Sequence, residues 1–129
     1  ELTVKLFSIL GALDNSQTDA HSTVKRALLH ISAHLEEPIT VASLAKAIYV
    51  SPRTLQRAFK ETFGHSPTEI ILAIKMHEAK RLLRSGRYRV NEVAYDMGFD
   101  SPSHFSRRYK EHYGAPPSNV AKAAKKQVI

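Results

Sequence analysis

The sequence predicts an all-α protein of about seven helices, in which two copies of one small helical unit are joined by a longer helix. Three observations predict this fold: a motif that occurs twice, helix-capping residues at the same point of each copy, and apolar residues spaced three or four apart. Each copy consists of a short helix, a tight turn and a second helix. The fold class therefore follows from a repeat whose members keep their spacing.

The repeat pairs residues of similar character along both copies. The separation is 49 residues as far as Phe99 and 50 from Ser101 onward, so one residue, Asp100 or a neighbour, is added in the second turn. The paired positions are Val41 and Val90, Leu44 and Val93, Ala45 and Ala94, Ile48 and Met97, Val50 and Phe99, Ser51 and Ser101, Leu55 and Phe105, Arg57 and Arg107, Phe59 and Tyr109, Lys60 and Lys110, Gly64 and Gly114, and Pro67 and Pro117. A register kept over so many positions indicates two structural units of the same design.

The second helix of each copy has a clear start and a clear end. Ser51-Pro52 and Ser101-Pro102 each place a capping hydroxyl before a proline that suits a first helical turn. Leu55 and Phe59 stand four apart, which puts them on one buried face. Arg53, Gln56, Arg57 and Lys60 then point outward. Gly64 and Gly114 stand where a helix ends in a left-handed residue.

Three further helices are predicted around the two copies. The first runs from about Ser22 to Leu35, the second from Pro67 to Arg84, and a short last helix from Pro117 through Val120. The middle helix has 18 residues, or about 27 Å at about 1.5 Å per residue.

We divide the chain accordingly. Residues 1–20 are expected to be a linker or the tail of a missing N-terminal domain, residues 21–84 a first subdomain with its linker helix, and residues 85–129 a second subdomain with a basic tail. The tail contains Lys122, Lys125 and Lys126. The apolar stretch at the start of the chain, and a first residue that is not methionine, favour a piece of a longer protein.

A short helix, a three-residue turn and a second helix with exposed Arg, Gln and Lys form a helix-turn-helix, whose second helix lies in the major groove. The sequence resembles the DNA-binding domain of the AraC/XylS family of bacterial transcription regulators over roughly Val24 to Val120. The motifs that carry the resemblance are Ser51-Pro52-Arg53-Thr54-Leu55-Gln56-Arg57-Ala58-Phe59-Lys60 with Gly64-His65-Ser66-Pro67, and Gly98-Phe99-Asp100-Ser101 with Phe105-Ser106-Arg107, Tyr109-Lys110, Gly114 and Pro117.

The resemblance implies the residues that contact DNA. Base contacts are expected from the exposed faces of the two recognition helices, at Arg53, Gln56, Arg57, Ser103, His104 and Arg107. Arginine can bind guanine O6 and N7 as a fork, and glutamine can bind adenine N6 and N7. Phosphate contacts, which fix register without reading sequence, are expected from Lys60, Arg108 and Lys110.

The resemblance also implies partners and a function. We expect sequence-specific binding of double-stranded DNA, transcription regulation, more often activation than repression, and RNA polymerase as a partner. An effector-binding or dimerisation domain is expected in the missing N-terminal part. No cofactor is implied.

Lys75 and Tyr49 are among the residues that depart from the family pattern. Lys75 stands where an arginine is usual in the linker helix, so we expect a weaker or single-toothed contact between the two halves. Tyr49 occupies the turn position that Gly98 fills in the second copy. If that position needs a positive φ, tyrosine is strained there by on the order of 1 kcal/mol or more.

Composition agrees with this interpretation. The chain has 129 residues with 19 Lys and Arg against 12 Asp and Glu, a net charge of +7 that favours a polyanionic partner. It has no cysteine, which excludes disulfides, thiolate nucleophiles and cysteine zinc sites. No apolar run is long enough for a membrane span and no signal peptide is visible, so a cytoplasmic location is expected.

No catalytic or metal-binding pattern accompanies these features. His30 and His34 stand four apart on a helix but lack a third ligand, so we interpret them as surface histidines. No Ser-His-Asp set, phosphate-binding glycine loop or carboxylate pair occurs, which predicts that the chain is not an enzyme.

The sequence alone leaves two alternative functions open. The chain could be the DNA-binding module of a repair protein that transfers alkyl groups, whose reactive cysteine would lie outside this segment. It could also be a basic helical module that binds RNA or protein, although its Phe and Tyr residues fall on core positions and not on stacking platforms.

Overall fold

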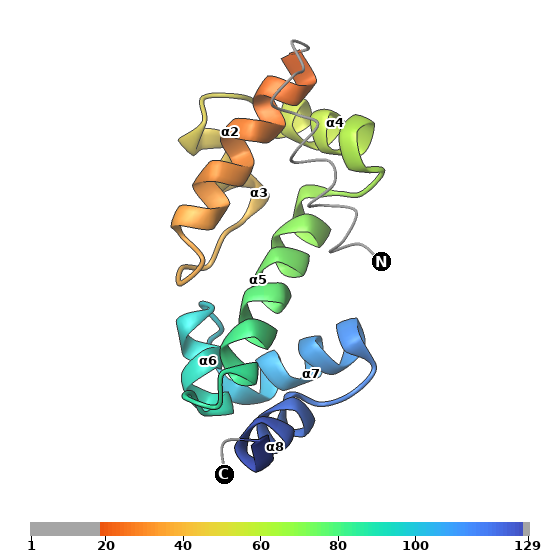
Figure 1. The fold of residues 1–129 in the computed structure, drawn as a ribbon. Helices are drawn as coiled ribbons and strands as arrows, with labels where there is room; N and C mark the ends of the chain where they lie inside the picture. The colour runs from red at the N-terminus through yellow and green to blue at the C-terminus, as the bar shows by residue number, and fades with distance from the viewer. Residues whose placement is uncertain (1–18, 128–129) are drawn as a thin grey trace. The chain divides into compact units, whose positions relative to one another are not determined.

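The computed structural model describes residues 19–127, and every regular element in that range is an α-helix, which confirms the predicted all-α class (Figure 1). The seven helices of this range are α2 (Asp19–Ala33), α3 (Val41–Ala47), α4 (Pro52–Phe63), α5 (Pro67–Arg84), α6 (Val90–Asp96), α7 (Pro102–Tyr113) and α8 (Pro117–Gln127). The predicted upstream segment, residues 1–20, lies outside the described residues except for its last two positions.

These helices form two compact units. Of the described residues, the first unit takes 19–34 and 39–74, and the second takes 35–38 and 75–127. The division therefore falls inside α5, whose first eight residues count with the first unit and whose remainder counts with the second.

In the first unit, α2 packs against α3 and α4 (Figure 1). The apolar stripes of these helices meet in a core that excludes water completely at Val24, Ile31, Leu44, Leu55 and Phe59. Removing such side chains from water is the main favourable term in folding. The stripe of α4 is the one that the spacing of Leu55 and Phe59 predicts.

In the second unit, α6 packs against α7, and both contact α8 (Figure 1). Its core contains Met76, Leu83, Val93 and Phe105, all fully buried. The Phe105 ring lies edge-on to Phe99 at 5.4 Å between centroids. Aromatic pairs in such tilted arrangements add to the stability that area burial provides.

The predicted helix boundaries are close to the observed ones. α5 has the predicted bounds, and α4 and α7 begin at the predicted prolines. Gly64 and Gly114 end these two helices in the left-handed conformation, with φ of 74° and 81°. The last helix is longer than predicted, because α8 continues past Val120 to Gln127.

Within the described part of the chain, no helix is both long enough and apolar enough to cross a membrane.

Candidate nucleic-acid interface

In the first unit, α4 has one face buried in the core and an opposite face that is exposed and polar. Ser51 caps its start, since the Ser51 Oγ accepts a hydrogen bond of 3.0 Å from the Thr54 backbone N–H. The face opposite the buried stripe carries Arg53, Gln56 and Arg57, all exposed. Within residues 19–127, no hydrogen bond or ion pair engages these three side chains. Their donors are therefore available to a ligand.

The second unit presents α7 in the same way. Ser101 Oγ accepts a hydrogen bond of 3.1 Å from the His104 backbone N–H, and Phe105 and Tyr109 form the buried stripe. Ser103 and Arg107 are exposed on the opposite face. Both helices thus offer polar side chains that a groove of DNA could accept.

His104, another predicted base-contacting residue, is held by its neighbours. Its Nδ1 lies 3.2 Å from the Asp100 Oδ1, and its ring lies edge-on to Phe99 at 5.3 Å. Only 37% of the side chain is exposed. To contact a ligand through this nitrogen, the imidazole would have to leave the carboxylate of Asp100.

The three predicted phosphate ligands are exposed, and two already have partners on or next to their own helix. Lys60 Nζ donates to the Gly64 carbonyl oxygen at 3.3 Å, and Arg108 is 3.1 Å from a carboxylate oxygen of Glu111. Exposed pairs of this kind contribute little free energy, so both cations can exchange these partners for phosphate. Lys110 is exposed on α7.

The turns before α4 and α7 begin with the same backbone arrangement. Val50 N–H donates to Ala45 O at 3.0 Å and Phe99 N–H to Ala94 O at 3.1 Å, while the preceding N–H groups of Tyr49 and Gly98 bond to residues three back. This is the Schellman arrangement, which needs a left-handed residue. Tyr49 has φ of 60° and Gly98 has φ of 81°, so the condition under which tyrosine is strained at this position is met.

Each turn is also fixed by a basic side chain from the helix that precedes the helix-turn-helix. Arg26 on α2 donates to the Ile48 carbonyl oxygen at 2.7 Å, and Lys75 on α5 donates to the Met97 carbonyl oxygen at 2.6 Å. Arg26 and Lys75 are themselves 49 residues apart, the separation of the repeat. This role of Arg26 was not predicted, because a backbone carbonyl 22 residues away leaves no mark in the sequence.

The expectation of a single-toothed contact for Lys75 was wrong. Besides the Met97 carbonyl, its Nζ donates to the carbonyl oxygens of Leu35 at 3.1 Å and Glu37 at 2.6 Å. All three donors of the ammonium group are therefore used. Burial lowers the pKa of Lys75, and the nearby Glu37 carboxylate opposes that shift.

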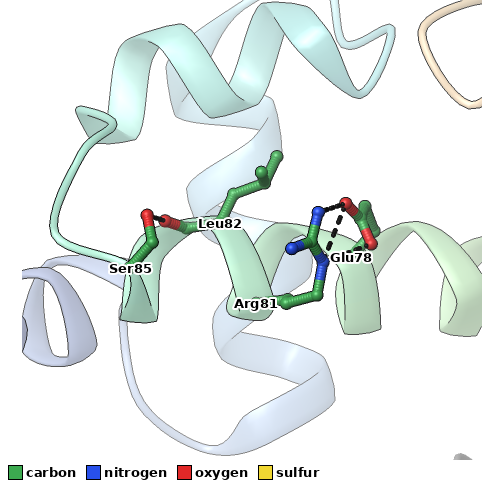
Figure 2. A network of polar contacts seen from close by, with 4 residues as sticks. All are labelled: Glu78, Arg81, Leu82 and Ser85. Carbon is green, nitrogen blue, oxygen red and sulfur yellow. Dashed lines mark hydrogen bonds and ion pairs between the residues drawn. The ribbon is translucent and has the colours of Figure 1, made fainter.

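A second group of basic residues lies along one face of α5. His77, Lys80, Arg81 and Arg84 line a small hollow of about 140 Å³. Arg81 Nε donates to both carboxylate oxygens of Glu78 (Figure 2). The Lys80 ammonium lies 4.5 Å from the centroid of the Tyr113 ring. Figure 2 also shows Ser85 Oγ donating to Leu82 O, at 2.6 Å, where the helix ends. Arg81 and Lys80 thus each have a partner inside their own unit.

His30 and His34 interact with each other. Their rings stack at 4.0 Å between centroids, and the His34 Nδ1 lies 2.8 Å from the His30 carbonyl oxygen. Among the residues that the structure describes, no group of three or more His, Cys, Asp and Glu is placed to hold a metal ion.

Comparisons with known proteins identify the family. A family model described as a helix-turn-helix domain matches residues 44–123. A solved transcriptional regulator from Chromobacterium violaceum, of the AraC-type DNA-binding domain class, superimposes with a TM-score of 0.73 at 27% identity, over 80% of this chain and 92% of that one. The chain belongs to the AraC-type helix-turn-helix family.

Two other relatives fit this family. The DNA-binding domain of AdpA, a global transcriptional factor solved in complex with a target DNA, is 30% identical with a TM-score of 0.71, over 78% of this chain and 91% of that domain. The transcriptional regulator ArgR of Pseudomonas aeruginosa is 30% identical over 81% of this chain. The chain spans only 32% of ArgR, about a third of its length. It is a DNA-binding domain of the kind found in transcription regulators.

Proposed function

We propose that this AraC-type domain binds a specific double-stranded DNA sequence by inserting α4 and α7 into the major groove, and that it does so as part of a transcription regulator. One observation carries the proposal: each unit holds a capped helix whose buried stripe faces the core and whose opposite face offers unpaired polar side chains. An ordinary solvent-exposed amphipathic helix does not require the same cap, the same turn and the same bonded carbonyl oxygen in two copies.

The proposed base contacts are Arg53, Gln56 and Arg57 from α4, and Ser103, His104 and Arg107 from α7. Fork-like hydrogen bonding by arginine and glutamine distinguishes base pairs in the major groove. Lys60, Arg108 and Lys110 are the proposed phosphate ligands, because their charges flank these reading positions.

For the whole protein, we propose effector binding or dimerisation in a further domain and contact with RNA polymerase, with regulation of transcription as the outcome. A reporter assay with the full-length regulator decides between activation and repression. An upstream domain with a reactive cysteine would instead favour the repair protein named among the alternatives.

The experiment that tests DNA binding begins with selection of bound sequences from random duplex DNA, followed by footprinting on the recovered site. We expect the chain to bind as a monomer over roughly 15 to 20 base pairs, with two protected segments about one helical turn apart. Affinity should fall steeply with salt, because basic side chains displace counterions. A single protected segment, or a requirement for two copies of this chain, would contradict the proposal.

A further inference from the structure

Tyr49 combines backbone strain with nearly complete exposure. Its φ of 60° lies in the left-handed region that bulky residues avoid, while 93% of its surface is exposed to solvent. Because the ring is not packed, burial of apolar area gives no compensation for the strained backbone. The equivalent turn of the second unit uses Gly98, which adopts the same conformation without strain.

The side chain stands at a defined place in the first helix-turn-helix. Tyr49 follows α3 and its C-cap residue Ile48, and it precedes Ser51, the N-cap of α4, by two positions. In helix-turn-helix proteins the first helix crosses the DNA backbone, and the N-terminal residues of the second helix contact base edges. A side chain between these two helices is therefore next to backbone phosphates when α4 occupies the groove.

The chemistry of the side chain fits that position. A tyrosine hydroxyl is one of the groups that proteins use to donate hydrogen bonds to phosphate oxygens. A tyrosine side chain carries no positive charge, so a hydrogen bond from it to a phosphate releases no counterion. The turn needs a left-handed residue but not a tyrosine, and residues strained in this way cluster at functional sites.

We propose that Tyr49 is a contact to the sugar-phosphate backbone of DNA, made through its hydroxyl at the entrance of α4 into the groove. The inference rests on the proposed function. It adds a DNA contact outside both recognition helices, and one that carries no charge.

The test compares Tyr49→Phe and Tyr49→Gly with the unaltered chain on the selected DNA site and on a shuffled duplex of equal length. Tyr49→Phe keeps the ring and the strained backbone but loses the hydroxyl, and it should weaken binding to both duplexes by about tenfold. The slope of affinity against salt should stay the same. Tyr49→Gly should weaken binding at least as much, with a melting temperature that is unchanged or a few degrees higher.

The controls separate this inference from the proposed function. Tyr88 lies outside both turns, and 38% of its surface is exposed. Tyr88→Phe should therefore leave DNA affinity unchanged. If Tyr49→Phe and Tyr49→Gly bind both duplexes like the unaltered chain while Arg57→Ala binds weakly, the inference is wrong and the proposed function stands. The inference is also wrong if they change base preference, or if they impair a transcription reporter without any loss of DNA affinity, which would indicate a protein partner. If the unaltered chain binds the selected and shuffled duplexes equally, the proposed function is wrong, and the inference that rests on it is wrong as well.

Discussion

Arg26 and Lys75 perform equivalent tasks with different side chains. Each comes from the helix before a helix-turn-helix and donates to the carbonyl oxygen at the C-cap of its first helix, at Ile48 and at Met97. These carbonyls have no partner within their own helices, since a helix end leaves its last acceptors unpaired. The two basic residues therefore fix the turns that aim α4 and α7.

Replacing Lys75 with methionine should destabilise the second unit. The substitution leaves three carbonyl oxygens without their donor, at Leu35, Glu37 and Met97, at a cost on the order of 1 to 3 kcal/mol. Chemical denaturation at neutral pH measures the change. Lys46→Met, at an exposed position on α3, is the control and should change stability by less than about 0.5 kcal/mol.

The unaltered chain and Lys75→Met should also differ in their response to alkali. Because burial lowers the pKa of Lys75, the unfolded chain binds this proton more tightly than the folded chain does. Between the lowered pKa and the ordinary value of 10.5, stability contributed by Lys75 therefore rises with pH. The difference in unfolding free energy between the unaltered chain and Lys75→Met should grow over that interval. A difference that shrinks would mean that the charged form is the one the fold prefers.

Gly98 has two reasons to be glycine, whereas Gly114 has one. A Cβ at Gly98 would lie 2.8 Å from the Glu37 carbonyl carbon and 3.0 Å from the Lys75 Nζ, but one at Gly114 would meet nothing within 4 Å. Both residues have positive φ. Gly114→Ala should then cost about 1 kcal/mol from the backbone alone, and Gly98→Ala about 3 kcal/mol because backbone must also move. Thermal melts of the two variants check the order, and equal losses would contradict it.

At the scale of the helix, α4 and α7 are built alike but carry different exposed side chains. α4 offers three long side chains with fork-like donors, at Arg53, Gln56 and Arg57. α7 offers Arg107 together with a short serine and a histidine that Asp100 holds. We therefore expect discrimination between bases to concentrate on α4.

Single substitutions test this inequality. Arg57→Ala should cost about 1 to 3 kcal/mol on the preferred site and relax the preference at one or two base pairs, because a bidentate contact is lost. His104→Ala should cost less. Binding to a panel of single-base operator variants measures both effects, and a larger change of base preference for His104→Ala than for Arg57→Ala is the result that overturns the expectation.

The helices were predictable from the sequence to different degrees, for physical reasons. Caps such as Ser51-Pro52 and the left-handed Gly64 are local signals, so the first and last residues of α4 and α5 could be predicted from the sequence. α8 was predicted too short, because beyond Val120 its alanines and lysines show no apolar period. These residue types are strong helix formers, and one of them, Ala124, is buried.

For the candidate site, the sequence predicted which residues are exposed but not which contacts hold the turns in place. The exposed face of α4 follows from the spacing of Leu55 and Phe59, and the structure places its polar residues outward. The contacts of Arg26 and Lys75 with carbonyl oxygens could not be predicted. Their partners are set by tertiary packing, and a backbone acceptor has no residue type to read.

At the scale of the whole molecule, we expect the excess of basic residues to determine how DNA affinity responds to salt concentration. The net charge is +7, and Lys60, Arg108 and Lys110 are exposed near the reading positions. Each phosphate neutralised by such a cation releases counterions, which makes affinity fall as salt rises.

Lys110→Ala should weaken binding to all duplexes about equally. The slope of log affinity against log salt should become shallower by roughly one, because one phosphate contact is lost. Titrations of the selected and shuffled duplexes at several salt concentrations measure the slope. An unchanged slope, or a loss confined to the selected duplex, would remove Lys110 from the phosphate ligands.

The short stretch Leu35–Pro38 follows a helix of the first unit along the chain but belongs to the second unit, where two of its carbonyl oxygens hold the Lys75 ammonium. The second helix-turn-helix is thus not a self-contained cassette. In a fragment that starts after Pro38, the buried Lys75 ammonium would keep only the Met97 carbonyl oxygen as an acceptor. A hybrid regulator made by exchanging residues 75–129 alone would combine them with a Leu35–Pro38 loop from another protein. Transfer of the second helix-turn-helix to another protein therefore has to include both Leu35–Pro38 and the chain from Lys75 onward.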